Sequence, residues 1–374
     1  MKKIKITMLT TSYPRYEGDL RGIFIQKLVK NLNASNEVEV NIIQPKDKYP
    51  DLLAGEGIFK NLKTNTNAKL QFIPCMADFF ARGIKNSKNC DIIHGNWVFS
   101  GLPGLIAKKI FRKPLLLTMR GGDLKPIHER SWIAKLYRFI LRRADLIVCV
   151  SEQIKGELNR IIKIDCEMIL NGIDNDIFKA INKLESRKKL KLKKDSLILT
   201  FSGRLTLDKG PLMLLKAFSK VKEKNLVLMF IGGGKIEENL KKVSKDLKIE
   251  DKVLFLGDIK HSEVPIYLSA SDIYVFPRFF DSGGNTILEA ASCGLPIIAT
   301  NEGFVKDILN YKGIELIEKN EDDLLKAIKK LVKNKKLRIR LGKEARQQIL
   351  NYGIGWKENS EKYLKLYKKL LSRN

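Results

Sequence analysis

The sequence lacks several features that would place it in other classes of protein. No run of about 18 consecutive apolar residues occurs, so we expect no membrane-spanning helix. Near the amino terminus, Lys5 and the threonines after it interrupt the apolar residues too early for a signal-peptide core. The five cysteines have no Cys-x-x-Cys spacing, so we expect buried, reduced thiols and no zinc site. These absences predict a cytoplasmic protein, attached at most peripherally to the inner face of a membrane.

The glycine-rich fingerprint of dinucleotide-binding proteins is also missing. The loop after the first predicted strand, residues 4–9, contains Gly18 and Gly22, but they do not form a Gly-x-Gly-x-x-Gly sequence. Two interpretations of this pair stay open: simple turn geometry, or a phosphate-facing loop at the end of the strand. We assign both glycines to the acceptor side of the predicted site.

Acidic residues are scarce relative to basic ones. The chain has 70 lysines and arginines but 42 aspartates and glutamates, which gives a formal net charge of +28. A compositional bias toward lysine explains this excess as well as a functional partner does. The partners that such a charge favours are an anionic membrane surface, nucleic acid or an anionic substrate. Because no helix-turn-helix, RNP or zinc-finger spacing is present, we expect no nucleic-acid partner.

Residues 131–143 predict an amphipathic helix. Helical spacing places basic residues on one face and apolar residues on another, namely Lys135, Arg138 and Arg142 against Trp132, Ile133, Leu136 and Ile140. Together with the basic segment 108–113, this helix is a candidate membrane-binding surface. The alternative is a solvated helix face over an ordinary core.

Length and the alternation of elements predict two α/β domains. A chain of 374 residues suggests two domains of about 100–200 residues each. Short apolar runs typical of buried parallel strands, among them residues 70–74, alternate with helical segments. A lysine-rich linker at 179–196 leads into the second series. We predict domains at 1–174 and 175–354 and a tail helix at 355–374.

The stretch 273–300 is organised as a ligand-binding unit. Its pattern predicts a strand, a loop, a helix and a second strand, with Asn285 or Thr286 as the cap of a helix that begins at Ile287. Such a unit is a right-handed crossover in a parallel sheet, and these units bind ligands at the carboxyl end of the first strand.

Two carboxylates lie eight positions apart in this stretch, Asp281 in the loop and Glu289 in the helix. Free N–H groups at a helix start attract phosphate, and a carboxylate just inside the helix can accept hydrogen bonds from ribose hydroxyls. The donor-binding residues expected here, besides the carboxylates, are Gly283, Gly284, Asn285 and Thr286. The stretch therefore predicts a seat for a phosphorylated sugar or a nucleotide.

A second loop supplies positive charge. After the predicted strand 197–201, the residues Gly203 to Gly210 include Arg204 and Lys209. Two fixed cations at a strand end can stabilise the negative charge that builds on a leaving diphosphate. Gly233, in a run of three glycines, would let a nucleotide approach the backbone; a flexible turn is the alternative.

These motifs resemble those of the retaining glycosyltransferases with the GT-B fold, in particular family 4, the glycosyl transferases group 1. The Asp281–Glu289 spacing is similar to the family's acidic-x7-Glu motif, although the family usually has Glu in the first place. The sequence of Gly203–Gly210 matches Gly-Arg-Leu-x3-Lys-Gly, and Asn171–Asp174 with Phe178 matches the motif at the domain junction. The resemblance implies two facing Rossmann-like domains with parallel sheets and a carboxyl-terminal helix that crosses back onto the first.

The resemblance also implies a set of acceptor-side residues in the first domain. Relatives commonly carry His-x-His, facing the interdomain cleft, where this chain has His94 and Asn96. The family's His-Gly-x-Asp segment corresponds to residues Arg120 to Asp123. Arginine cannot act as a general base. Arg120 therefore either holds an anionic acceptor or forms a salt bridge with Asp123 that fixes the loop.

The activity implied is transfer of a glycosyl group from a nucleotide-diphosphate sugar to a saccharide or lipid-linked acceptor, with retention of configuration. It implies no metal and no other cofactor, because Arg204 and Lys209 take the place of the metal beside Asp281 and Glu289. By analogy, the pathway is synthesis of cell-surface polysaccharide or glycolipid. The alternatives are a sugar-nucleotide epimerase of the same general fold and a basic nucleic-acid-binding protein.

Overall fold

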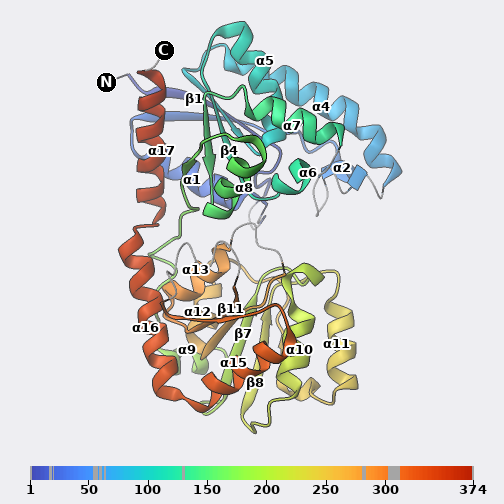
Figure 1. Cartoon of the computed structure of the whole chain (residues 1–374), viewed down its shortest axis with the longest axis vertical. Helices are drawn as coiled ribbons and strands as arrows, with labels where there is room; N and C mark the ends of the chain where they lie inside the picture. Colours follow the sequence, from blue (N-terminus) through green and yellow to red (C-terminus); the bar gives the residue numbers. More distant parts are fainter. Residues whose placement is uncertain are drawn as a thin grey trace. The chain divides into compact units, whose positions relative to one another are not determined.

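The computed structural model describes residues 2–16, 19, 21–53, 58, 61–62, 65–128, 131–279, 284–301 and 312–372. The chain forms two compact units, which Figure 1 shows in sequence colours. Unit 1 contains Met1–Gly172 and Trp356–Asn374, and unit 2 contains Ile173–Gly355. Each unit consists of a parallel sheet covered by helices, and each is described by itself.

Unit 1 is built on a six-stranded sheet with the order β2-β1-β3-β4-β5-β6. Its strands are β1 (Ile4–Thr10), β2 (Val38–Ile43), β3 (Ile92–Asn96), β4 (Leu115–Met119), β5 (Leu146–Cys149) and β6 (Glu167–Met168). Neighbouring strands pair in parallel, and Asn96 at the end of β3 lies opposite Thr10 and Thr118. Because helices cover both faces of such a sheet, the central strands β3 and β4 are buried along their whole length.

Helices connect the strands of unit 1. They are α1 (Ile23–Ala34), α2 (Pro50–Leu53), α4 (Thr66–Ser87), η1 (Val98–Ser100), α5 (Gly101–Phe111), α6 (Leu124–His128), α7 (Trp132–Leu141) and α8 (Glu152–Ile162). Two of them begin at a serine whose side chain accepts a hydrogen bond from the first turn: Ser131 caps α7 and Ser151 caps α8. These caps satisfy N–H groups that a helix leaves without an internal partner.

The strand predicted at residues 70–74 is wrong, because these residues lie inside α4. The side chain of Asn65 caps this helix by accepting from the Ala68 N–H, and the buried residues Ala68, Cys75 and Phe79 recur at helical spacing. The short apolar run is thus one part of a longer helical pattern. Pro74 lies within the helix, where it lacks an N–H for the regular backbone bond.

The carboxyl-terminal helix α17 (Trp356–Leu371) returns to unit 1, as predicted. It packs against α1. Its buried residues Tyr363, Leu364 and Tyr367 join a core cluster that includes Ile6 and Met8 of β1. The helix therefore covers one face of the first sheet.

Unit 2 repeats the architecture with the strand order β12-β11-β10-β7-β8-β9. Its strands are β7 (Leu197–Ser202), β8 (Leu226–Ile231), β9 (Val253–Phe255), β10 (Ile273–Phe276), β11 (Ile297–Thr300) and β12 (Ile314–Ile317). Its helices are α9 (Lys183–Lys189), η2 (Leu207–Lys209), α10 (Pro211–Ser219), α11 (Glu237–Asp246), η3 (Glu250–Lys252), α12 (Val264–Ala270), α13 (Asn285–Ser292), α15 (Glu321–Lys333) and α16 (Lys335–Tyr352). Helices α10 and α15 pack together, as do α13 and α16.

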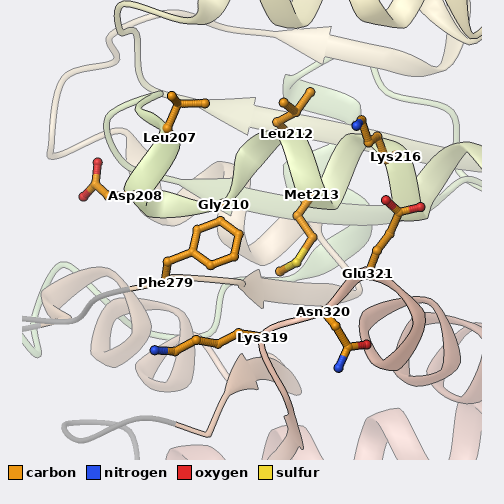
Figure 2. A pocket seen from close by; sticks show the side chains of 10 residues that line it. All are labelled: Leu207, Asp208, Gly210, Leu212, Met213, Lys216, Phe279, Lys319, Asn320 and Glu321. Atoms are coloured by element: carbon orange, nitrogen blue, oxygen red, sulfur yellow. The ribbon is translucent and has the colours of Figure 1, made fainter.

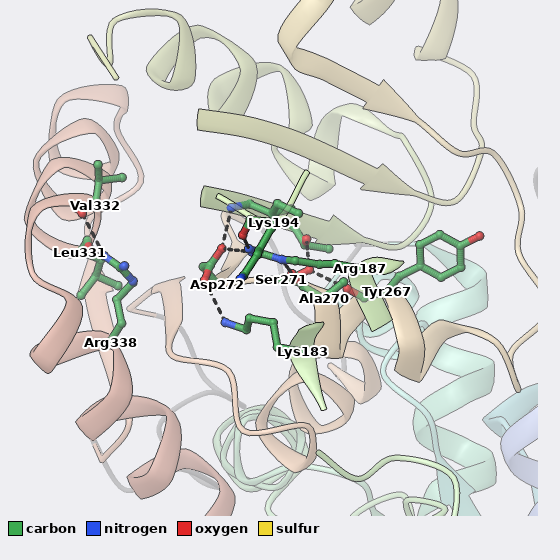
Figure 3. A network of polar contacts seen from close by, with 12 residues as sticks. Lys183, Arg187, Lys194, Tyr267, Ala270, Ser271, Asp272, Leu331, Val332 and Arg338 are labelled. Carbon is green, nitrogen blue, oxygen red and sulfur yellow. Dashed lines mark hydrogen bonds and ion pairs between the residues drawn. The ribbon is translucent and has the colours of Figure 1, made fainter. Parts of the chain in front are cut away.

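The segment predicted as a linker, 179–196, contains α9, which a buried charge cluster ties to the sheet (Figure 3). The Arg187 guanidinium donates to the Asp272 carboxylate at 2.6 Å and to the backbone oxygens of Ala270 and Lys194. Asp272 also accepts from the Ile198 N–H at 2.8 Å. The cluster lies where β7 and β10 begin, which is the edge opposite to the predicted ligand site.

Candidate active site

The loop after β7 contacts the loop after β10. The N–H of Phe279 donates to the Asp208 carbonyl at 3.0 Å. Gly210 has a φ of 73°, and a Cβ there would lie 1.9 Å from the Pro277 carbonyl oxygen. A side chain would force the two loops apart, so only glycine fits. These contacts join the segment with Arg204 and Lys209 to the segment that leads into α13.

The two predicted cations differ in their surroundings. Arg204 is exposed, and its guanidinium makes no hydrogen bond or ion pair with any residue that the structure describes. The Lys209 side chain is 16% exposed, and its ammonium lies 3.5 Å from the Asp208 carboxylate. Lys209 is therefore held in place, whereas Arg204 can move toward an anion.

The predicted glycines in this region have different roles. Gly203, at the end of β7, has a φ of 134°, and a Cβ there would approach only the Arg278 guanidinium, at 4.0 Å. Space thus remains above this strand end. The N–H of Gly233 instead donates to the Asp258 carboxylate at 2.9 Å, and its carbonyl accepts from Leu205. Both backbone groups of Gly233 are engaged within the unit, and its place beside a donor stays a prediction that depends on the missing side chain.

Helix α13 begins two residues earlier than predicted. Gly284 occupies the N-cap position, no side chain caps the helix, and Asn285 and Thr286 form its first turn. The N–H groups of Ile287 and Leu288 bond to the Gly284 carbonyl. An end without a side-chain cap at the carboxyl edge of a sheet keeps the character of an anion site.

Glu289, in the second turn of α13, has a partner that the sequence analysis did not assign. Its Oε1 lies 2.9 Å from Nε2 of His261, which follows β9. The Glu289 side chain is 11% exposed and that of His261 is 27% exposed. The His261 ring packs against Phe178, with 4.9 Å between ring centroids. The signal available in the sequence was the position of His261 in a loop at the carboxyl end of a strand.

In unit 1, His94 is completely buried, which contradicts the prediction that it faces a cleft. Its Nδ1 lies 2.8 Å from the Tyr367 hydroxyl and its Nε2 lies 2.8 Å from Oγ1 of Thr118. Burial lowers the pKa of His94 to about 3, with a further contribution from the positive charge of Arg120. A neutral imidazole donates one of these bonds and accepts the other. The residue therefore fastens α17 to the sheet.

Arg120 is engaged by asparagines, and not by the predicted side-chain salt bridge to Asp123. Its guanidinium donates to Oδ1 of Asn96 at 2.8 Å and to Oδ1 of Asn171 at 2.5 Å. It also lies over the Phe24 ring, 4.9 Å from the centroid. Asn96 is completely buried. These bonds connect the ends of β3 and β4 to the motif at the domain junction and leave part of the guanidinium for a ligand.

Asp123 is buried and bonds to the backbone of neighbouring loops. Its carboxylate accepts from the N–H groups of Val98 and Arg120, at 2.9 and 3.0 Å. Burial raises the pKa of Asp123 to about 6, although these bonds and the nearby Arg120 charge act in the opposite direction.

Gly22 has a φ of 65°, and a Cβ there would lie 2.2 Å from the Ser12 carbonyl oxygen. Turn geometry therefore accounts for this glycine.

Comparisons with known proteins bear on the family of the chain. The family model for glycosyl transferases group 1 matches residues 182–348, and the model for glycosyltransferase family 4 matches residues 22–177. The chain belongs to glycosyltransferase family 4. This family 4 chain is 29% identical, over 70% of its length and 71% of the relative, to UDP-Gal:alpha-D-GlcNAc-diphosphoundecaprenol alpha-1,3-galactosyltransferase from Escherichia coli.

Solved structures share the GT-B fold of this family 4 chain. Sucrose-phosphate synthase from Thermosynechococcus elongatus superposes with a TM-score of 0.81 at 20% identity, covering 100% of both chains. Anabaena HepE in complex with UDP-glucose superposes with a TM-score of 0.76 at 17% identity, covering 98% of this chain and 100% of that one. At these identities the likeness bears on the fold alone.

Some predicted site residues of this glycosyltransferase lie outside the described residues, namely Asp281, Gly283 and Gly18. Among the residues that are described, no group of three or more His, Cys, Asp or Glu side chains could hold a metal ion. In the same part of the chain, no helix combines the length and hydropathy needed to cross a bilayer.

A cavity of about 530 Å³ lies beside the loop from Gly203 to Gly210 that carries Arg204 and Lys209, here called the cation loop (Figure 2). Its lining is largely apolar with charges among the rest, and comprises Leu207, Asp208, Gly210, Leu212, Met213, Lys216, Phe279, Lys319, Asn320 and Glu321. It shares Leu207, Asp208 and Gly210 with the cation loop. The described residues that line it include neither Arg204 nor Glu289, so the cavity adjoins the predicted diphosphate site and is separate from it.

Proposed function

We propose that this glycosyltransferase transfers a glycosyl group from a nucleoside diphosphate sugar to a saccharide or lipid-linked acceptor, with retention of anomeric configuration. The observation that carries the proposal is the contact between two loops of unit 2. The loop with Arg204 and Lys209 touches, at Gly210 and Pro277, the segment that continues into α13 and Glu289. Cations and a carboxylate thereby share one edge of the sheet, where nucleotides bind in parallel α/β folds.

Each group has a defined task in the proposed reaction. Arg204 and Lys209 stabilise the charge that develops on the diphosphate as the bond between sugar and phosphate breaks. Glu289 accepts hydrogen bonds from the ribose hydroxyls, and Asp281 binds the donor sugar. The acceptor oxygen bonds to the anomeric carbon on the face that the phosphate leaves, and the phosphate takes the acceptor's proton. No side chain then acts as a nucleophile.

In this scheme the two cations replace a divalent metal, because they supply positive charge at the diphosphate. Full activity in the presence of EDTA is the expected outcome, measured as release of nucleoside diphosphate from the donor sugar. A loss of activity that added Mg²⁺ or Mn²⁺ restores would contradict this part of the proposal.

A panel of nucleoside diphosphates tests donor binding. UDP, GDP, ADP and CDP are compared by thermal shift, and at least one should raise the melting temperature, because a ligand that binds the folded state stabilises it. Glu289→Gln should weaken that shift. The matched control is Glu344→Gln on α16, which removes the same charge from a surface pair with Arg340. The absence of a shift with every nucleotide would overturn the proposal.

The proposed acceptor is lipid-linked or a surface saccharide, which places the enzyme peripherally on the inner face of the membrane. The name of the Escherichia coli relative specifies a diphosphoundecaprenol acceptor. Unit 1 has exposed basic and apolar side chains on α5, on α7 and on the residues directly after each, and the two helices pack together. This α5–α7 patch consists of Ile106, Lys109, Ile110, Arg112, Trp132, Lys135, Phe139, Arg142 and Arg143.

The patch differs in part from the predicted helix faces. Ile140 is buried, the Arg138 guanidinium donates to the Ile127 carbonyl, and Lys108 pairs with Asp145 at 2.6 Å. Trp132, in contrast, is 72% exposed. Amphipathic side chains of this kind favour the boundary between headgroups and acyl chains, and the basic residues favour anionic lipids.

Vesicle co-sedimentation tests the patch. Vesicles of phosphatidylglycerol and phosphatidylcholine should bind the protein, and those of phosphatidylcholine alone should bind it less, with a difference that shrinks as salt rises. The double variant Trp132→Ser, Lys135→Ser should bind less than wild type. A control with Lys343→Ser and Leu350→Ser removes the same kinds of exposed side chain from α16. Equal binding to neutral and anionic vesicles would dispose of the role of the basic residues, and no binding to either would dispose of the membrane proposal.

A further inference from the structure

His261 contacts Glu289, the second carboxylate of the acidic motif, and Phe178, which follows the motif at the domain junction. Its Nε2 lies 2.9 Å from Oε1 of Glu289, and its ring packs at an interplanar angle of 59° against Phe178. Phe178 is buried and its N–H donates to the Asp174 carbonyl, at the end of the junction motif. A line of contact therefore runs from the junction motif through the imidazole to the carboxylate.

The direction of the hydrogen bond follows from the chemistry of the two groups. An ionised carboxylate can only accept, so Nε2 of His261 carries the proton and donates. The bond occupies one lone pair of Oε1 and leaves the other lone pairs of Glu289, including those of Oε2, for further donors. Two vicinal hydroxyls of a ribose are such donors, and each needs an acceptor in a defined place.

The hydrogen bond from His261 to one oxygen of Glu289 restricts the whole side chain, and so fixes the position of the other oxygen. A free glutamate side chain loses rotamer freedom when it binds a ligand, and this loss weakens binding. A glutamate that is already held by His261 has lost that freedom before the ligand arrives. Phe178 acts one step earlier, because its ring restricts the orientation of the imidazole.

We propose that His261 is a positioning residue that holds Glu289 for ribose, and that it thereby sets the preference of the donor site for ribonucleotides over deoxyribonucleotides. Phe178 supports the imidazole in this task. The inference rests on the proposed function, because it takes the nucleoside of the donor as the ligand of Glu289. It adds a residue and a specificity to that function.

The experiment compares UDP with 2′,3′-dideoxy-UDP by calorimetric titration, with GDP or ADP and their dideoxy forms instead if the panel selects one of them. His261→Phe keeps an aromatic ring against Phe178 but lacks the donor. It should weaken ribonucleotide binding about tenfold, as expected for a lost hydrogen bond to a charged group. Affinity for the dideoxynucleotide should stay within about twofold, because that ligand has no hydroxyls for Glu289.

A conservative variant separates positioning from packing. The Nε2 amide of Gln reaches about as far as the imidazole Nε2, so His261→Gln should retain most of the preference for ribose. In steady-state kinetics with the nucleotide sugar, His261→Phe should raise the donor KM and leave kcat nearly unchanged, the pattern of a lost ground-state contact. The double variant His261→Phe, Glu289→Gln should bind no more weakly than Glu289→Gln alone, because the two residues act as one.

The possible results distinguish this inference from the proposed function. If wild type binds none of the nucleotides, both fail. If wild type prefers the ribonucleotide and Glu289→Gln removes that preference while His261→Phe leaves it intact, the role of His261 alone is overturned. Equal weakening of ribo- and dideoxynucleotide by His261→Phe overturns it as well. Melting curves of each variant without ligand show whether a weakened variant is folded.

Discussion

The two units use the carboxyl ends of their parallel strands for different purposes. In unit 1, Asp123 is buried there and accepts from backbone N–H groups, while His94 is buried in the middle of β3 and bonds to α17 and β4. In unit 2, Arg204 stays exposed and Glu289 keeps acceptor capacity beyond its bond to His261. The same topology thus places polar residues at the same edge, and their environment decides whether they stabilise the fold or remain available to a ligand.

Unit 2 also has a buried cluster of charged groups at the opposite edge of its sheet. The largest effect on stability should therefore come from the cluster of Arg187 and Asp272. Arg187→Ala leaves a buried carboxylate without its main partner, and we expect a loss of about 3–5 kcal/mol in the free energy of unfolding, measured by urea denaturation. The matched control is Lys183→Ala, whose side chain is 43% exposed, with a loss of at most about 1 kcal/mol. Equal losses from the two variants would contradict a buried structural pair.

At the ligand edge of unit 2 the opposite pattern is expected. Arg204→Ala and Lys209→Ala should each lower turnover about 10²-fold or more, because a preorganised charge at the leaving group is lost. The melting temperature of Arg204→Ala should not change, since the side chain is exposed. Lys224→Ala removes an exposed lysine just before β8 and serves as the control for both measurements. Unchanged turnover in both variants would show that the cations of unit 2 do not act on a ligand, and would contradict the contrast with unit 1.

The structural role of His94 in unit 1 should make the free energy of unfolding depend on pH. The folded pKa of His94 is about 3, below the usual 6.5, so its contribution to stability is complete above pH 6.5 and is lost as pH falls toward 3. Between pH 6.5 and 5 the loss should be about 2 kcal/mol. Asp123 acts in the other direction, because its folded pKa of about 6 exceeds its usual value, and stability rises as pH falls through 6.

Comparison with a variant isolates the histidine. His94→Gln should be less stable than wild type at pH 7, but its free energy of unfolding should fall less between pH 6.5 and 5, by about the same 2 kcal/mol. The measurement is urea denaturation at each pH. Parallel pH profiles for the two proteins would show that His94 does not become charged on unfolding in this range.

The smallest effect concerns the hydroxyl that joins α17 to the sheet. Tyr367→Phe removes the group that bonds Nδ1 of His94 and should cost about 1 kcal/mol in the free energy of unfolding, with no change in nucleotide affinity. Tyr16→Phe, at an exposed position in the same unit, is the control and should have no measurable effect. A loss of nucleotide affinity in Tyr367→Phe would mean that the first unit's polar cluster serves ligand binding after all.

The features that were predicted well from the sequence are those that depend on residues close together in the chain. The order of strand, loop, helix and strand at 273–300 follows from apolar runs separated by glycines, and β10, α13 and β11 occupy this stretch. The loop from Gly203 to Gly210 was found because its residue spacing is specific. Even here a boundary moved, because Gly284 and not a side chain begins α13.

The features that were missed depend on contacts between distant parts of the chain. His94 and Tyr367 are 273 positions apart, so nothing near His94 indicates that a helix covers it. His261 and Glu289 are 28 positions apart and lie on different elements. The run at 70–74 looks like a strand in a short window, whereas its helical period extends over the whole of α4. Local patterns give the elements, and packing decides which polar residues remain accessible.

The return of α17 has a consequence for biosynthesis. Unit 1 is discontinuous in sequence, since Trp356–Asn374 belong to it and Ile173–Gly355 do not. During translation the ribosome completes all of unit 2 before the last helix of unit 1 emerges. Until then the surface of Ile6, Met8 and Leu28 that this helix covers stays exposed, and His94 lacks the Tyr367 hydroxyl as a partner. Unit 1 can therefore complete its core only after the whole chain has been made, and its apolar surface is prone to aggregate until then.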